Sequence, residues 1–336
     1  MKAHALLQRC LHSRYFWPLL ALALILLANL FISPAFFQVE LRDGRLYGSL
    51  VDVLNRGTPV ALLAIGMSLV IATGGVDLSV GAVIAITGAV CANLITDTDM
   101  SLLMIMTLGL LAGLAAGLVN GGLVSYLGIQ PIVATLVLMV AGRGIAQLIN
   151  DGQIITFTHD GFAFLGVGSL LGLPAPVVIT VIVLLLVHGL VRFTALGLFI
   201  EAVGCNAQAS HYAGVPVKGV KLAVYGISGL CAAVAGMIIT ADIQGADANN
   251  AGLWLELDAI LAVVIGGAAL AGGRFSLVLS VIGVLIIQAL STTILVSGIA
   301  PQYNLLIKSL VVIAVLLLQS AVFKRQVSLL WRREAA

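Results

Sequence analysis

The side chains of this sequence that could do chemistry are few, and most of them interrupt long apolar stretches. Two carboxylates, Glu256 and Asp258, open the run ELDAILAVVIGG. A third, Asp77, follows a Gly-Gly pair in TGGVDLSVG and is close to Ser79, and Arg143 stands within another apolar run. Ionisable residues in such runs usually face water, a cavity or a partner. They are therefore candidate solute contacts or, alternatively, proton or sodium sites.

The composition of the chain determines the solvent around these residues. Of 336 residues, 61% are hydrophobic and 9% are charged, whereas roughly 25% are charged in an average globular protein. We therefore expect an all-α, polytopic membrane protein. A helix needs ~20 apolar residues to cross a bilayer, which leaves room for about ten crossings. The expected spans are about 15–32, 58–73, 76–95, 101–125, 131–149, 174–191, 219–241, 256–271, 276–297 and 302–319.

The first apolar run and the basic residues predict the orientation. The run from Phe16 to Ile32 is longer than the usual apolar core of a signal peptide, so we interpret it as a retained anchor. With the N-terminus inside, most Lys and Arg residues fall on the cytoplasmic side, as expected for a membrane protein. These residues are Lys2, Arg9, Arg14, Arg192, Lys218, Lys221, Arg274, Lys324, Arg325, Arg332 and Arg333. We expect cytoplasmic tails at 1–14 and, strongly basic, at 320–336, around a transmembrane domain at 15–319.

Small residues mark where helices should approach each other. Gly109, Gly113, Gly117 and Gly121 follow one another at four-residue spacing. In lipid, such a stripe lets two helix backbones pack closely, so we interpret it first as a packing surface.

The segment around the Gly74-Gly75 pair is open to two interpretations. Asp77 and Ser79 could form a tight turn and cap the next helix. Alternatively, the break could make a discontinuous helix that lines a solute path. The eight residues from Asp77 weakly resemble those from Asp258, and the two spans should run in opposite directions. This similarity suggests an inverted repeat.

Enzyme motifs are absent from the sequence. It contains no H-E-x-x-H, no G-x-S-x-G and no G-x-x-x-x-G-K-[ST], and its five histidines show no metal-ligand spacing. We expect no catalytic residues, metal site or bound cofactor in this chain. If ATP drives the protein, another chain binds it. The net charge of +2 gives no indication of nucleic-acid binding.

The longest cytoplasmic connection is expected at 192–221. It contains EAVGCNAQASHYAGV at 201–215, in which Ala202, Cys205, Ala209 and Tyr212 would share one face of a short helix. This pattern fits an amphipathic loop helix at the interface and fits equally a docking element for a cytoplasmic partner.

Four motifs in order carry a resemblance to a known family. They are IGMSLVIATGGVDLSVGAV (65–83), IQPIVATLVLMVAGRGIAQLI (129–149), EAVGCNAQASHYAGV (201–215) and ELDAILAVVIGGAALAGG (256–273). Together they resemble the permeases of ABC importers for ribose-type monosaccharides, over about residues 51–319. Within this family, the segment 241–267 is most similar to a permease of galactofuranose importers.

The resemblance implies a sugar importer of the bacterial inner membrane that works by alternating access. The partners it implies are a second, different permease, a cytoplasmic ATPase that binds ATP and Mg, and a periplasmic sugar-binding protein. Segment 201–215 would match the coupling helix that docks on the ATPase. The implied coupling residues are Glu201, Gly204, Asn206, Ala209, His211 and Gly214. The candidate contacts along the translocation path are Asp77, Ser79, Arg143, Asn249, Asn250, Glu256 and Asp258.

The role of Glu256 and Asp258 stays open among several alternatives. They could contact sugar, favour the start of a helix through its dipole, form an ion pair with a residue such as Arg143, or contact the binding protein. An ion-coupled secondary transporter, in which Asp77, Glu256 or Asp258 binds the ion, is the main competing function. A passive channel is a third class.

Overall fold

A computed structural model describes residues 15–32, 34–42, 44–170 and 172–319, and within them the chain is mostly helical. The expected tails at 1–14 and 320–336 lie outside the described residues. The helices are α2 (Phe16–Ile32), α3 (Ser49–Ala72), α4 (Val80–Asp97), α5 (Leu102–Ser125), α6 (Pro131–Ile149), α7 (Asp160–Val167), α8 (Ala175–Phe193), α9 (Ala195–Cys205), α10 (Ala207–Tyr212), α11 (Val217–Ile243), α12 (Leu255–Ile265), α13 (Leu277–Val296) and α14 (Asn304–Gln319), with 3-10 turns at Pro34–Phe37 and Pro301–Tyr303.

Seven helices of the described chain are long and apolar enough to cross a membrane: α3, α4, α5, α6, α8, α11 and α13. The expectation of about ten crossings is not confirmed, because α2, α12 and α14 have only 17, 11 and 16 residues. The expected span at 256–271 is wrong beyond Ile265. There the helix gives way to turns in which Gly267 and Gly272 adopt φ values of 86° and 94°, a conformation that glycine tolerates and other residues rarely adopt.

The span expected at 58–73 begins earlier, at Ser49. Its first two turns contain Asp52, Asn55 and Arg56. Because these residues are polar, a search of the sequence for apolar runs places the start of the span after them. These polar residues precede the apolar part of one continuous helix of 24 residues.

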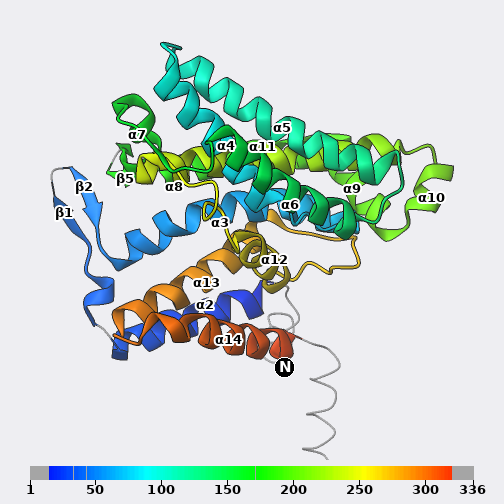
Figure 1. Cartoon of the computed structure of the whole chain (residues 1–336). Coiled ribbons are helices and arrows are strands. Elements are labelled where there is room, and N and C mark those ends of the chain that lie inside the picture. The colour runs from blue at the N-terminus through cyan, green and yellow to red at the C-terminus, as the bar shows by residue number, and fades with distance from the viewer. Residues whose placement is uncertain (1–14, 33, 43, 171, 320–336) are drawn as a thin grey trace, which may run out of the picture.

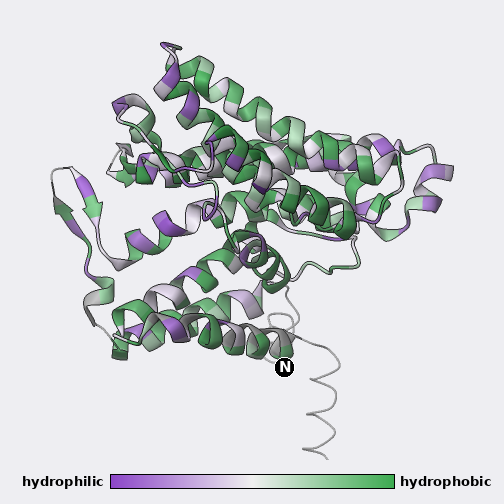
Figure 2. Ribbon diagram, in the orientation of Figure 1, coloured by the Kyte–Doolittle hydropathy of each residue, from purple (hydrophilic) through white to green (hydrophobic). Residues whose placement is uncertain are grey.

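The helices form an inner and an outer layer (Figure 1). Most residues of α3, α4, α11 and α13 are buried, whereas α5, α6 and α8 are mostly exposed. The main core joins Leu63 and Met67 of α3 with Ile84, Val263 and Ile287 of α4, α12 and α13. The exposed faces are apolar, as Figure 2 shows. Because exposed apolar faces of this extent are unusual in water, they mark surfaces that meet lipid or another membrane protein.

The glycine stripe of α5 packs directly against α11. A Cβ atom added at Gly113 would lie 2.5 Å from Ala233 Cβ and 2.7 Å from the carbonyl oxygen of Gly229. One added at Gly117 would overlap the carbonyl oxygen of Tyr225. The two backbones therefore touch, which is what the stripe predicts for helices held together in lipid.

Three short two-stranded antiparallel ladders depart from the all-α expectation. They are β1 (Glu40–Arg42) with β2 (Arg45–Tyr47), β3 (Ile155–Thr156) with β6 (Gly245–Ala246), and β4 (Ser169–Leu170) with β5 (Leu173–Pro174). The β1–β2 hairpin, α7 and β5 lie at one end of the bundle and α10 at the other (Figure 1). We call these the hairpin end and the α10 end.

Candidate functional site

The connection between α3 and α4 is a buried polar turn. Helix α3 ends at Ala72, and the chain reverses through Gly74, which has φ 78°. Asp77 is 1% exposed, and its two carboxylate oxygens accept hydrogen bonds from different elements. Oδ1 accepts from Ser79 N at 3.1 Å and Ser79 Oγ at 2.6 Å, and Oδ2 accepts from Ser228 Oγ of α11 at 2.8 Å. This carboxylate therefore ties the turn to α11.

Ser79 does not cap α4 in the expected way. It occupies the N-cap position, but its side chain makes no capping hydrogen bond. Its hydroxyl instead donates to Asp77 and accepts a hydrogen bond of 2.7 Å from Asn120 Nδ2 of α5. We call Asp77, Ser79, Asn120 and Ser228 the Asp77 cluster. The cluster joins α5 and α11 to the α3–α4 turn, and Asp77 and Ser79 are closed off from solvent.

Arg143 fixes the loop between α11 and α12. Its Nη1 atom donates to the carbonyl oxygens of Ala248 at 3.1 Å and Ala251 at 2.6 Å. One turn further along α6, Gln147 Nε2 donates to Asn249 Oδ1 at 2.6 Å. The guanidinium thus provides hydrogen-bond donors for two loop carbonyl groups that have no partner within a helix.

Within that loop, Asp247 organises the two candidate asparagines. Its Oδ1 accepts from the backbone N–H groups of Asn249 and Asn250, and its Oδ2 accepts from Asn250 Nδ2 at 2.7 Å. Both asparagines are exposed. They are therefore placed where a solute could reach them.

Glu256 lies in the first turn of α12, as the sequence predicts, and is only 6% exposed. A Cβ atom at Gly81 of α4 would lie 2.6 Å from Glu256 Oε2. This oxygen has no hydrogen-bond partner within the described chain. Arg143 attracts the Glu256 carboxylate electrostatically. Glu256 Oε2 is therefore an enclosed acceptor that is left without a hydrogen bond between α12 and α4.

Asp258 has a different partner from the one expected. Lys308 Nζ of α14 lies 2.9 Å from Asp258 Oδ2 and 3.1 Å from Oδ1. Of the alternatives left open by the sequence, an ion pair is observed, with Lys308 of α14 in the place of Arg143. The ion pair joins α12 to α14 and leaves Asp258 engaged in holding two helices together.

Replacing Lys308 with alanine should destabilise the protein by about 2–3 kcal/mol. The cost is below the roughly 3–5 kcal/mol of a fully buried pair because 21% of the Asp258 side chain is exposed. The midpoint of thermal unfolding in detergent measures the change. The double variant Lys308→Ala/Asp258→Ala should recover most of the loss, since it leaves no unpaired carboxylate. Equal losses in the single and double variants would show that the pair does not hold α14.

At the α10 end, α9 and α10 form an elbow. Asn206 separates them, and its Oδ1 accepts from Ala209 N at 2.9 Å, which caps α10. Ala209, His211 and Gly214 are exposed, and Tyr212 is 80% exposed. The segment therefore presents a small surface at the tip of the molecule, while half-buried Glu201 borders a cavity of about 480 Å³ with Arg192.

Gly204 connects this elbow to the membrane-embedded turns. A Cβ atom there would overlap the carbonyl oxygen of Ala72 and the amide nitrogen of Gly273. Those two atoms form a hydrogen bond of 2.8 Å. A Cβ atom at Gly272 would lie 2.9 Å from both Gly204 O and Gly74 N. We call Ala72, Gly74, Gly204, Gly272 and Gly273 the glycine junction.

The predicted residues thus fall into separate groups. Asp77 and Ser79 lie together, Arg143 and Asn249 meet at the α11–α12 loop, and Asp258 is paired elsewhere. Sequence reasoning missed Asn120, Ser228, Asp247 and the Lys308 partner. Asn120 could have been noticed as an amide directly before Gly121 of the glycine stripe.

Known proteins similar to this chain are permeases. A family model described as "Branched-chain amino acid transport system / permease component" matches residues 49–316. The galactofuranose transporter permease protein YtfT of Escherichia coli (strain K12) is 58% identical over 315 residues, which covers 92% of each chain. The fructose import permease protein FruF of Bifidobacterium longum (strain NCC 2705) is 38% identical, over 93% of this chain and 89% of that protein.

The ribose import permease protein RbsC of Escherichia coli (strain K12) is 36% identical, over 90% of this chain and 92% of that protein. No solved structure matches this chain.

Proposed function

The chain belongs to the family of permease components of branched-chain amino acid transport systems, and from this premise we propose that it forms part of the membrane path of an ATP-driven importer of galactofuranose. The observation that carries the proposal is the 58% identity to a galactofuranose transporter permease along 92% of both chains. Identities to fructose and ribose permeases are lower, at 38% and 36%. The family and the apolar spans make this chain a multi-pass membrane transport subunit rather than an enzyme.

The partners in this proposal are three other proteins. A second, different permease completes the path, a cytoplasmic ATPase binds ATP and Mg, and a periplasmic protein delivers the sugar. The α10 end faces the cytoplasm, because Arg192, Lys218 and Lys221 flank the α9–α10 elbow and basic residues concentrate on that side. Both termini then lie in the cytoplasm of a cell whose inner membrane holds the protein.

The mechanism in this proposal is alternating access driven from the elbow. When the ATPase binds and hydrolyses ATP, it moves α10, and α9 carries that movement to Gly204. Gly204 touches both Ala72 and Gly273. A displacement of Gly204 therefore moves the end of α3 and the segment before α13 at the same time. Closely packed contacts of this kind transmit small shifts instead of absorbing them.

The interior residues have two kinds of role in this scheme. The Asp77 cluster holds the α3–α4 turn in shape, and the Arg143 contacts hold the α11–α12 loop. Both segments contain backbone groups outside helices, and within a membrane such groups need hydrogen-bond partners from the protein. Asn249 and Asn250 are exposed and are the groups available to sugar hydroxyls, whereas Glu256 Oε2 is enclosed against α4. The sugar needs only weak binding here, since a path must release what it accepts.

The docking of α10 can be tested by ATPase activity. We expect the complex of this chain with its genetic neighbours to hydrolyse ATP faster when the sugar-loaded binding protein is added. Tyr212→Glu places a charge on the exposed face of α10 and should abolish this stimulation and release the ATPase during purification. Tyr303→Glu, which changes an exposed tyrosine outside the elbow, is the matched control and should keep both. Stimulation that survives Tyr212→Glu would exclude α10 as the docking element.

A further inference from the structure

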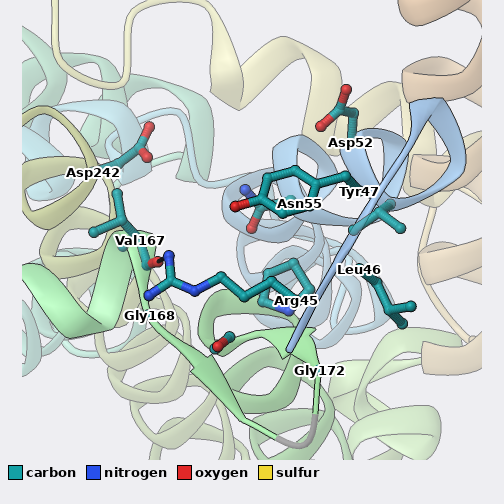
Figure 3. A pocket seen from close by; sticks show the side chains of 13 residues that line it. Arg45, Leu46, Tyr47, Asp52, Asn55, Val167, Gly168, Gly172 and Asp242 are labelled. Atoms are coloured by element: carbon teal, nitrogen blue, oxygen red, sulfur yellow. Dashed lines mark hydrogen bonds between the residues drawn. The ribbon is translucent and has the colours of Figure 1, made fainter. Parts of the chain in front are cut away.

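A cavity of about 200 Å³ lies at the hairpin end (Figure 3). It shares no lining residue with the Asp77 cluster or the Arg143 contacts. Its polar lining comes from elements far apart in the sequence: Arg45 and Tyr47 from β2, Asp52 and Asn55 from α3, Ser169 from β4 and Asp242 from the end of α11. Figure 3 shows the side chains of Asp52 and Asp242 on opposite sides of the cavity and the Arg45 guanidinium at Val167.

The walls of the cavity are held by backbone contacts. Gly166 approaches α11 so closely that a Cβ atom would overlap the amide nitrogen of Asp242. On the other side, Leu46 N donates to Gly172 O at 3.0 Å, which joins β2 to the turn between β4 and β5. Arg45 Nη1 donates to Val167 O at 3.4 Å. The polar side chains thus project from fixed backbone, as a binding site requires.

The lining matches the chemistry of a neutral polyhydroxyl ligand. Asn55 lines the cavity, and its Oδ1 has no hydrogen-bond partner within the described chain, so this amide has an acceptor left for a hydrogen bond from a ligand. Asp52 and Asp242 offer further acceptors, and the Arg45 guanidinium has five N–H donors. The ring of Tyr47, half exposed at 49%, can pack against an apolar C–H face.

The size of the cavity limits the ligand further. A volume of about 200 Å³ corresponds to roughly six or seven water molecules at ~30 Å³ each. One sugar ring is of this size, whereas a disaccharide or a nucleotide is larger.

We propose that this cavity is a binding subsite for a single monosaccharide, which holds the sugar at the hairpin end before it enters the membrane path. Asp52, Asp242 and Asn55 accept hydrogen bonds from sugar hydroxyls, Arg45 donates to ring or hydroxyl oxygens, and Tyr47 covers one face. The subsite deepens the proposed function and rests on it for the identity of the sugar.

The location of the subsite gives it a connection to transport. Asp52 and Asn55 belong to the first two turns of α3, and α3 ends at Ala72 in the glycine junction. A sugar in the cavity therefore touches the same continuous helix whose other end contacts Gly204.

The test is equilibrium binding of methyl β-D-galactofuranoside to the full-length chain, co-purified with its partner subunits in nanodiscs without the binding protein. We expect saturable binding, with leucine failing to compete. Asn55→Ala and Asp242→Asn should each weaken binding by about tenfold or more, since hydrogen bonds to charged or buried groups are of that strength. Asp151→Asn, an exposed carboxylate outside the cavity, is the matched control and should bind as the native chain does.

Each outcome separates the subsite from the proposed function. No saturable binding to the native chain, or equal binding by the cavity variants, overturns the subsite whatever the uptake assay shows. Binding that the cavity variants weaken, in a protein that shows no ATP-driven sugar uptake, supports the subsite and contradicts the proposed function. If either variant does not assemble, Asp52→Asn takes its place, because Asp52 is exposed on the first turn of α3.

Discussion

Replacing Gly204 with alanine is expected to lower ATP-driven sugar uptake by about tenfold or more while the protein still reaches the membrane. The added Cβ atom would overlap Ala72 O and Gly273 N, so α9 must move away from the two turns that it contacts. Overpacking of this kind costs about 1–3 kcal/mol. It weakens the contact of α9 with Ala72 and Gly273, which is the contact proposed to carry the movement of α10 to the membrane helices. Uptake of labelled sugar per molecule of permease measures the effect.

Gly144→Ala is the matched control for this prediction. Gly144 lies in α6, and an added Cβ atom there meets no atom within 4 Å. Uptake should therefore stay close to that of the native chain. Native uptake by Gly204→Ala would mean that the glycine junction does not couple the elbow to the helices.

Replacing Asp77 with alanine should have the second large effect, on stability. The change removes the acceptor for Ser79 N, Ser79 Oγ and Ser228 Oγ at a site that is 1% exposed. Each buried group left unpaired costs roughly 1–3 kcal/mol, so we expect a loss of about 3–5 kcal/mol and little assembled protein. Fluorescence-detected size-exclusion chromatography of the membrane extract measures this loss.

The variant Asp77→Asn distinguishes two possible roles of Asp77: a structural hydrogen-bond acceptor and a binding site for a coupling ion. Asparagine keeps one oxygen acceptor and nearly the same shape, so most of the protein should assemble and transport should remain driven by ATP. An ion-coupled carrier would behave differently: asparagine cannot take up and release the proton, and gradient-driven transport would stop in a well-folded protein. Such a result would favour the competing function.

The sequence predicts regular membrane helices well because apolar length is a direct signal. Residues 131–149 form α6 with the boundaries expected, and the glycine stripe of α5 meets a neighbouring helix as predicted. Failures occur where the backbone turns within an apolar run. Helix α12 ends at Ile265, before Gly266 and Gly267, and Gly272 and Gly273 adopt positive φ in the following turns, although the residues around them are as apolar as those of a continuous helix.

Side-chain partners were harder to predict than helices. Asp258 pairs with Lys308, fifty positions away, and Arg143 binds backbone carbonyls instead of a carboxylate. Both outcomes depend on which helices are neighbours, which hydropathy does not specify. The cavity at the hairpin end was missed for the same reason, since its polar residues come from four elements. The inverted repeat and the roles of the coupling residues stay predictions.

The central claim is that this chain moves a monosaccharide at the expense of ATP bound by another subunit. The most direct measurement is accumulation of galactofuranose in proteoliposomes that contain this chain with its partner permease and ATPase, with the loaded binding protein on one side and ATP and Mg on the other. The account predicts accumulation that requires all four proteins and ATP and persists when ion gradients are collapsed. Accumulation by this chain alone, driven by a proton or sodium gradient, would contradict it.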